Sequence, residues 1–281
     1  MVGETGSRSS DDEPAERGVW RYARATRASV IVDAEHYFRH MQDAMLKAER
    51  RVLLIGWDFD TRIHLAHGRR WWQRPSDASH PSRLGSFIPW LSRKRPRLHI
   101  YILKWSVGAI KLMLRGAMTL DLLRWFPRRR IDFKSDTAHP LGGSHHQKIV
   151  IIDDRLAVCG GIDMTSGRWD TRDHETDDPD RTLPNGKAYG PWHDATMMVE
   201  GPIAEALGDL GRDRWHVAGG KHLSPVEPTE GERWPEALEA QFENVEIGIA
   251  RTRAEHKDTA QICEIADLFE QQILGARKLI Y

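Results

Sequence analysis

Apolar residues alternate between helical and strand spacing along most of the chain. Between residues 34 and 48 they recur at steps of three and four, as at Tyr37, Met41 and Met45, which predicts an amphipathic helix. An apolar run over 52–57 then predicts a strand. The same order returns as a helix over 83–94, a strand over 99–103, a helix over 108–125 and a short strand over 131–133. This alternation predicts an α/β sandwich around a mixed or parallel sheet.

The middle of the chain predicts a hairpin, a long loop, a strand and a helix. A β-rich run over 145–153 is followed by a polar turn and a second run over 156–159, which together indicate the hairpin. Residues 167–191 are polar and rich in Asp, Gly and Pro, so we expect a functional loop at the rim of a site. A strand over 195–199 and a helix from Pro202 to about residue 215 come next.

We expect four parts along the chain. They are a mobile polar tail over 1–29, a main unit over 30–218, a linker over 219–244 and the start of a truncated second half over 245–281. The last part carries strand spacing over 245–250 and helical spacing over 260–274. Residues 44–54 and 272–281 are similar when one residue is skipped, which indicates a weak internal repeat or a coincidence between two helix-to-strand junctions.

Composition excludes several classes of protein. Lysine and arginine number 41 and aspartate and glutamate number 41, so overall charge gives no basis for non-specific nucleic-acid binding. The most apolar stretch, 98–123, contains four charged residues, and this argues against a membrane span. The first residues lack a secretory signal, and 2 cysteines cannot build a disulfide framework. We therefore expect a cytoplasmic protein.

A histidine and a lysine stand at strand spacing in the first run of the hairpin. His146 and Lys148 are two residues apart, so an unbroken strand places both side chains on one face. Asp153 is an odd number of residues from His146 and falls on the opposite face beside the turn. We expect it to orient backbone rather than to touch a substrate.

A pair of glycines follows the second run of the hairpin. Gly160 and Gly161 remove side chains where a backbone must approach another group closely. Asp163 and Ser166 offer hydrogen-bonding groups directly after them. We expect the hairpin and these residues to form one half of a phosphate-sized pocket.

The whole constellation closely resembles the signature of the phospholipase D superfamily. Its parts are His146-x-Lys148-x-x-x-x-Asp153, Gly160-Gly161-x-Asp163, Gly167-Arg168-Trp169-Asp170 and Trp192-His193-Asp194 before a strand and Gly201-Pro202. The junction ending at Tyr281 is similar as well, so the resemblance spans about residues 30–281. It implies a phospholipase D-like αβα sandwich with a mixed sheet, present as one complete half and the start of a second.

The resemblance also implies a mechanism. His146 would attack the phosphorus of a glycerophospholipid, and Lys148 would hold the non-bridging oxygens while charge develops. A second histidine, to which Asp194 would hydrogen-bond, would protonate the leaving alcohol and then activate water or another alcohol. Such a phosphodiesterase or transphosphatidylase needs neither a metal nor another cofactor.

The second histidine and lysine have no counterpart in this sequence. No second His-x-Lys-x-x-x-x-Asp motif follows residue 154, so the resemblance implies that a second copy of the chain or a further C-terminal half completes the site. A nucleic-acid phosphodiesterase uses the same core, but zero net charge and the Gly-Gly-x-Asp form disfavour nucleic acid as a partner. An inactive phosphate- or lipid-binding remnant is the third alternative.

Two clusters combine arginine with tryptophan. One includes Arg124, Trp125, Phe126 and Arg128–Arg130, and the other surrounds Trp71 and Trp72. They suit peripheral contact with lipid head groups at a membrane or, equally, cations at the end of a helix. Acidic residues over 173–180 lack the spacing of a calcium loop, so we expect a solvated loop there.

Overall fold

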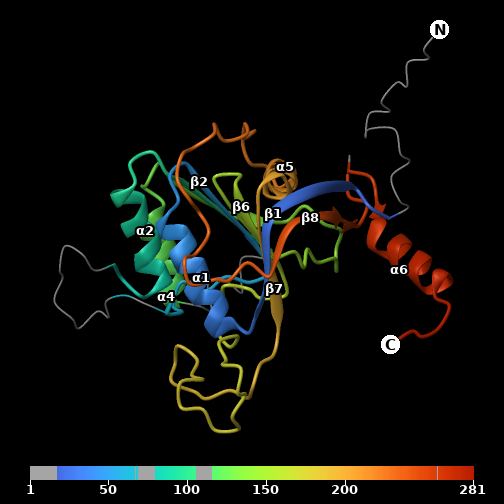
Figure 1. The fold of residues 1–281 in the computed structure, drawn as a ribbon. Coiled ribbons are helices and arrows are strands. Elements are labelled where there is room, and N and C mark those ends of the chain that lie inside the picture. The colour runs from blue at the N-terminus through green and yellow to red at the C-terminus, as the bar shows by residue number, and fades with distance from the viewer. Residues whose placement is uncertain (1–17, 67, 69–79, 106–115, 258) are drawn as a thin grey trace.

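The computed structural model describes residues 18–66, 68, 80–105, 116–257 and 259–281. Its central feature is an eight-stranded sheet in the order β4-β3-β2-β5-β6-β7-β1-β8 (Figure 1). The strands are β1 (Arg21–Val32), β2 (Arg51–Gly56), β3 (His99–Trp105), β4 (Ile131–Asp136), β5 (Ile149–Ile152), β6 (Leu156–Gly160), β7 (Ala195–Glu200) and β8 (Phe242–Ile249). The strands β9 (Thr252–Arg253) and β10 (Ile262–Cys263) form a separate pair.

The sheet is mixed, as the sequence predicts. β2, β3 and β4 pair in parallel, whereas β2 with β5, β5 with β6, and β6 with β7 are antiparallel. The predicted hairpin is thus β5 and β6 with their turn. The strand with parallel and antiparallel neighbours, β2, is buried over Val52–Ile55 because it lies near the middle of the sheet.

Helices cover both faces of the sheet, which confirms the predicted α/β sandwich (Figure 1). α1 (Ala34–Leu46), α2 (Leu84–Lys94) and α4 (Gly116–Trp125) pack on one face, and α5 (Pro202–Val217) packs on the other. Strand periodicity divides the apolar side chains between the faces: Leu54 and Ile152 join the first core, and Leu53 and Ile151 join the second. The part of the predicted 108–125 helix before residue 116 lies outside the described residues. None of the described helices is long and apolar enough to cross a membrane.

The polar tail predicted through residue 29 is too long, because β1 begins at Arg21. β1 pairs with β7 on one side and β8 on the other. Its buried positions include Ala25, Ala28 and Ser29, which are completely or almost completely buried. Small buried side chains next to arginines carry little hydrophobic signal, and the sequence analysis therefore misses most of the strand. The prediction for residues 1–17 lies outside the described residues.

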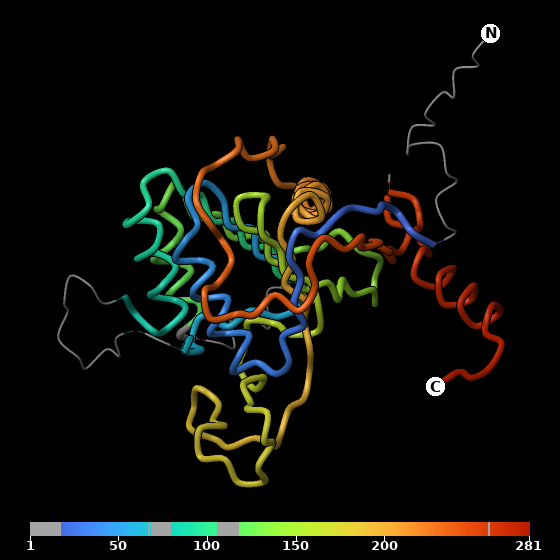
Figure 2. Tube along the Cα trace, in the orientation of Figure 1, coloured from blue at the N-terminus to red at the C-terminus, as the bar shows by residue number. Residues whose placement is uncertain are grey.

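The C-terminal part is joined to the same sheet and then leaves it. β8 extends the sheet beyond β1, and the predicted linker crosses the molecule with Leu223 and Trp234 buried (Figure 2). α6 (Glu264–Gly275) projects away from the sheet and has no buried residue (Figure 1). Residues 276–281 form no strand, contrary to the expected start of a core strand. The division into domains stays a prediction.

The turn between β5 and β6 is anchored by one carboxylate. Asp153 is buried and accepts backbone N–H hydrogen bonds from Glu49, Arg50 and Arg51 at 2.8, 2.7 and 2.7 Å. Nε of Arg233 lies 2.8 Å from its second oxygen. The start of β2, the β5–β6 turn and the segment around residue 233 therefore meet at one side chain.

We predict that Asp153→Ala lowers the free energy of unfolding by about 3–5 kcal/mol, because it leaves a buried guanidinium and several N–H groups without their acceptor. Urea unfolding followed by circular dichroism measures the loss. Asp177→Ala, at an exposed aspartate in the 167–193 loop, is the matched control. A loss below about 1 kcal/mol for Asp153→Ala would contradict the anchor.

Candidate active site

One edge of the sheet collects the polar residues of the sequence motif. β2 and β3 end there, β5 begins there, β6 ends there and β7 begins there, as the register Ile55–Ile149, Ile149–Cys159 and Cys159–Met197 shows. β1 also ends at this edge, because Val32 pairs with Ala195. Residues directly before or after these strands are therefore neighbours although they are far apart in sequence.

Lys148 and Asp163 form a buried ion pair at this edge. Nζ of Lys148 lies 3.2 Å from Oδ2 of Asp163, and the two side chains are only 7% and 1% exposed. The same ammonium donates to the carbonyl oxygen of His146 at 3.1 Å. Burial raises the pKa of the Asp163 carboxyl, and the positive charge of Lys148 opposes that shift. The ion pair with Asp163 thus fixes the position of the Lys148 ammonium.

His146 and Lys148 do not lie within a strand, in contrast to the prediction. β5 starts at Ile149, because its ladder with β2 ends at the Ile55–Ile149 pair. Residues 143–148 approach the sheet edge as irregular chain, and His146 is exposed. Its ring contacts Trp57 edge-on, with centroids 5.4 Å apart. The imidazole therefore stands at the surface next to the buried lysine.

The two glycines after β6 allow two different close approaches. A Cβ on Gly160 would clash with the backbone of Thr196 on β7, so this glycine permits the pairing of β6 with β7. A Cβ on Gly161 would overlap the carboxylate of Asp194. One oxygen of Asp194 also accepts the N–H of Ala195 at 2.8 Å. Gly161 and Asp194 are thus brought together at this edge of the sheet.

Ser166 serves a neighbouring group rather than an open pocket. Its hydroxyl donates to Asp60 at 2.9 Å, and Asp60 is fully buried. Asp60 also pairs with Arg62. Although burial alone raises the pKa of Asp60, hydrogen bonds from Arg62 and Ser166 lower it overall. Ser166 therefore supports the segment after β2, and its proposed contact with substrate stays a prediction.

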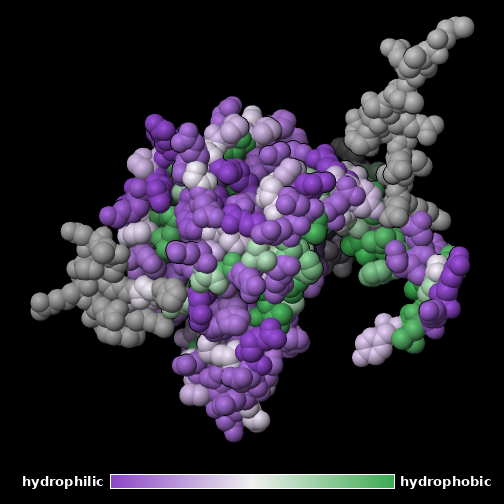
Figure 3. Space-filling view, viewed as in Figure 1, coloured by the Kyte–Doolittle hydropathy of each residue, from purple (hydrophilic) through white to green (hydrophobic). Residues whose placement is uncertain are grey.

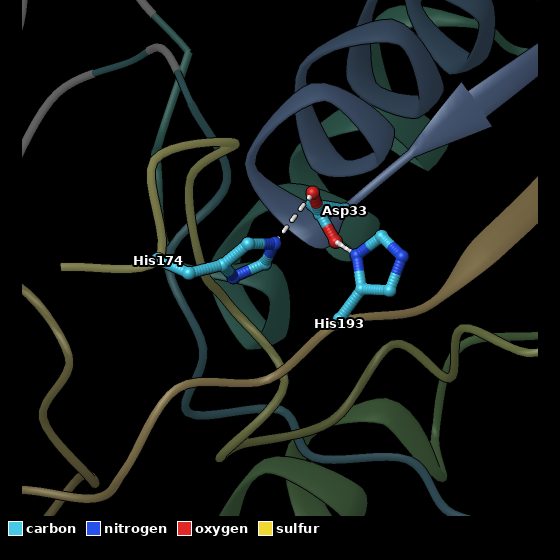
Figure 4. A group of neighbouring side chains, drawn as sticks. All are labelled: Asp33, His174 and His193. Atoms are coloured by element: carbon cyan, nitrogen blue, oxygen red, sulfur yellow. Dashed lines mark hydrogen bonds and ion pairs between the residues drawn. The ribbon is translucent and has the colours of Figure 1, made fainter. Parts of the chain in front are cut away.

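A second polar cluster at this edge was not predicted from the sequence. Asp33, after β1, is 1% exposed in its side chain and lies between two histidines: Oδ1 is 2.8 Å from Nδ1 of His193, and Oδ2 is 3.2 Å from Nε2 of His174 (Figure 4). Nδ1 of His174 lies 3.1 Å from Asp170. The cluster joins the 167–193 loop, which forms the mostly hydrophilic lobe in Figure 3, to the strand ends.

These three side chains are also a donor set for a divalent cation. Two imidazoles and a carboxylate, with their ligand atoms within 4.8 Å of one another, suit zinc and similar ions, and the carboxylate of Asp170 behind His174 would orient that ligand. Hydrogen bonds from Trp192, His174, Thr171 and Arg181 outweigh the opposite effect of burial and lower the pKa of Asp170. The three residues stand at positions 33, 174 and 193, so no local spacing in the sequence indicates a metal site. The sequence analysis expects no metal.

We predict that Gly161→Ala displaces the Asp194 carboxylate and leaves the fold intact, since the clash is with a side chain. A crystal structure of the variant measures the displacement. Gly186→Ala, in the 167–193 loop with no atom near its missing Cβ, controls for adding a methyl group at a glycine. An unmoved Asp194 contradicts the prediction.

Comparisons with known proteins agree with the motif. A family model described as Phospholipase D matches residues 127–260, which include the candidate site from His146 to Asp194. The chain is 23% identical to phospholipase D B of Dictyostelium discoideum over 216 residues, 67% of this chain and 17% of that protein. It is 28% identical to phospholipase D zeta 1 of Arabidopsis thaliana over 224 residues, 69% of this chain and 19% of that protein.

The chain spans only a part of such relatives, from 12% of phospholipase D C of Dictyostelium discoideum to 29% of phospholipase D alpha 1 of Vigna unguiculata. Phosphatidylserine synthase of Haemophilus influenzae is a similar solved structure, at TM-score 0.41, 9% identity and coverage of 67% of this chain and 37% of that one. Nuc of Salmonella typhimurium, a phospholipase D family member, is another, at TM-score 0.38 and 12% identity, with coverage of 67% of this chain and 95% of that one. The motif, the family match and the curated relatives together support membership of the chain in the phospholipase D superfamily.

Proposed function

We propose that the chain supplies one half of a phospholipase D-type phosphodiesterase site. The observation that carries the proposal is an exposed imidazole, His146, directly beside a buried ammonium, Lys148, which is held by Asp163. A nucleophile must reach the substrate, whereas the cation that stabilises the transition state works best in a partly dehydrated position. His146 is exposed and Lys148 is buried, which suits these two roles.

The proposed reaction has two displacements. A ring nitrogen of neutral His146 forms a bond to phosphorus while the bond from phosphorus to the leaving alkoxide breaks, and a second histidine gives that alkoxide a proton. Water or another alcohol then gives its proton to the second histidine and attacks the phosphohistidine, which releases His146. Lys148 faces the non-bridging oxygens, and contacts to Asp163 and the His146 carbonyl use two of its three donors.

The second histidine has to come from outside these 281 residues, since the sequence holds one His-x-Lys motif. A second copy of the chain or a further half of a longer polypeptide can supply it. Asp194, at the same sheet edge, is the group we assign to hydrogen-bond that histidine and to stabilise its protonated form. Neither a phospholipid nor a nucleic acid can be processed without this completion.

We propose a glycerophospholipid as the substrate. The curated relatives named above are phospholipases D, and equal numbers of acidic and basic residues provide no general attraction for a polyanion. A nucleic-acid phosphodiesterase is the second candidate, because the same histidine chemistry cleaves any phosphodiester.

With a phospholipid substrate, contact with the bilayer is peripheral. Phe126, 91% exposed at the end of α4, is a candidate for this contact, whereas Trp125 is buried. The cluster around Trp71 lies outside the described residues.

Substrate and site are tested together with the chain in the assembly that supplies the second histidine. Phosphatidylcholine and phosphatidylethanolamine vesicles with labelled head groups are compared with a labelled single-stranded DNA. We expect head-group release and a loss of at least about 1,000-fold in His146→Ala, a change on the order of 4 kcal/mol in the barrier. His222→Ala removes an exposed histidine after α5 and should retain the rate.

Cleavage of DNA without release of a head group supports the second candidate instead. Binding of vesicles with no cleavage of either substrate, in an assembly known to contain both histidines, indicates a non-catalytic remnant. A His146→Ala protein that is folded and cleaves at the normal rate would overturn the assignment of the nucleophile.

A further inference from the structure

The residue after β2 connects the separate parts of the site through its backbone. The N–H of Trp57 donates to Oδ1 of Asp163 at 3.0 Å, and the N–H of Asp58 lies 3.3 Å from the same oxygen. The other oxygen of that carboxylate holds Lys148. A Cβ at Gly56 would lie 3.0 Å from Oδ1 of Asp163, so the chain needs a small residue before Trp57 to come this close.

The side chain of Trp57 contacts both groups that we assign to the phosphate. The His146 ring meets it edge-on, with centroids 5.4 Å apart and planes at 60°. Nζ of Lys148 lies 6.0 Å from the centroid of the same indole, at the limit of a cation–π contact. One ring therefore touches the exposed imidazole and approaches the buried ammonium.

A second tryptophan holds this ring in place. Trp105, at the end of β3, stacks on Trp57 with centroids 5.6 Å apart and planes at 13°. β2 and β3 are parallel, and the pairing of Gly56 with Lys104 brings the two tryptophans to the same level of the sheet edge. The ring of Trp105 also lies near that of His139, with centroids 5.9 Å apart, in the segment that leads to the motif. The indole of Trp57 is thus supported by the sheet.

We infer that Trp57 is a positioning residue that fixes the orientation of His146 relative to Lys148. The inference rests on the proposed function, since it concerns the same two side chains. His146 belongs to an irregular and exposed segment, so the strand ladder does not restrict its ring. An in-line attack needs the nucleophilic nitrogen aimed at phosphorus while the oxygens face the ammonium, and a fixed aromatic edge supplies that restraint. Trp105 acts one step further away, through the stack.

The test compares Trp57→Ala and Trp57→Phe in the complete assembly with Trp90→Ala as a control. Trp90 is a half-buried tryptophan of α2 that packs on His80 and Phe87. We expect kcat to fall about 10- to 100-fold in Trp57→Ala with KM changed less than about threefold, since orientation is lost but binding is not. Trp57→Phe, which keeps an aromatic edge, should recover most of the rate, and Trp90→Ala should keep it.

A second readout does not depend on turnover. In protein labelled with 13C-histidine, the ring protons of His146 are assigned from their absence in His146→Ala. Their chemical shifts should move in Trp57→Ala, when the indole ring current is removed, and should stay unchanged in Trp90→Ala. If Trp57→Ala does not fold, Trp105→Ala, which removes the ring stacked on Trp57, carries the same comparison.

A normal kcat in folded Trp57→Ala, or chemical shifts of the His146 ring protons that stay unchanged in that variant, would overturn the inference. A rate loss that appears entirely in KM would do so as well, because it would place Trp57 in binding alone. Failure of the proposed function looks different: His146→Ala then cleaves normally, while the shifts of His146 still report whether Trp57 contacts it.

Discussion

The buried ion pair between Lys148 and Asp163 is the interaction on which the site depends. Each partner comes from a chain segment that ends at the same sheet edge, and removing either would leave the other charged and dehydrated. The cost of burying the pair is offset by backbone N–H groups of Trp57 and Asp58 on the free side of the carboxylate. The ends of β2, β5 and β6 therefore have to meet for the lysine to be stable where it is.

The spacing of the sequence motif has a direct structural meaning in this arrangement. The four residues between Lys148 and Asp153 are β5 itself, Ile149–Ile152. The strand has its reactive end at Lys148 and its anchored end at Asp153, which binds three backbone N–H groups and Arg233. Shortening or lengthening the strand by one residue would separate the lysine from Asp163 or the aspartate from its donors. The spacing of the motif thus equals the length of β5, with Lys148 directly before the strand and Asp153 directly after it.

The sequence predicts most of the fold because its signals are local. Apolar periodicity identifies β2, β3 and α1, and the turn residues identify the β5–β6 hairpin. β1 is missed because two of its buried residues, Ala25 and Ala28, have little apolar surface and are three residues apart, which is not strand spacing. The exposed position of His146 outside β5 is also missed, since periodicity continues through residue 146 whereas the partner strand stops at Gly56.

The site could be predicted only as far as its residues are adjacent in sequence. His146, Lys148 and the two glycines lie at the two ends of one hairpin and are recognisable as a motif. Trp57 and Asp33 enter the site because separate strands end at one edge, which depends on strand order and register and leaves no local pattern. The contact of Gly161 with Asp194 is of the same kind, although there the resemblance to a known family already indicated that both residues matter.

Trapping the covalent intermediate is the most direct test of the central claim. The complete assembly is mixed with a phospholipid labelled with 32P at the phosphodiester, quenched in base within one turnover, digested and mapped by mass spectrometry. The account predicts a phosphorylated imidazole at His146, stable in base and labile in acid, and none in His146→Ala. A label found on the second histidine with His146 unmodified, or turnover with no labelled histidine at all, would contradict it.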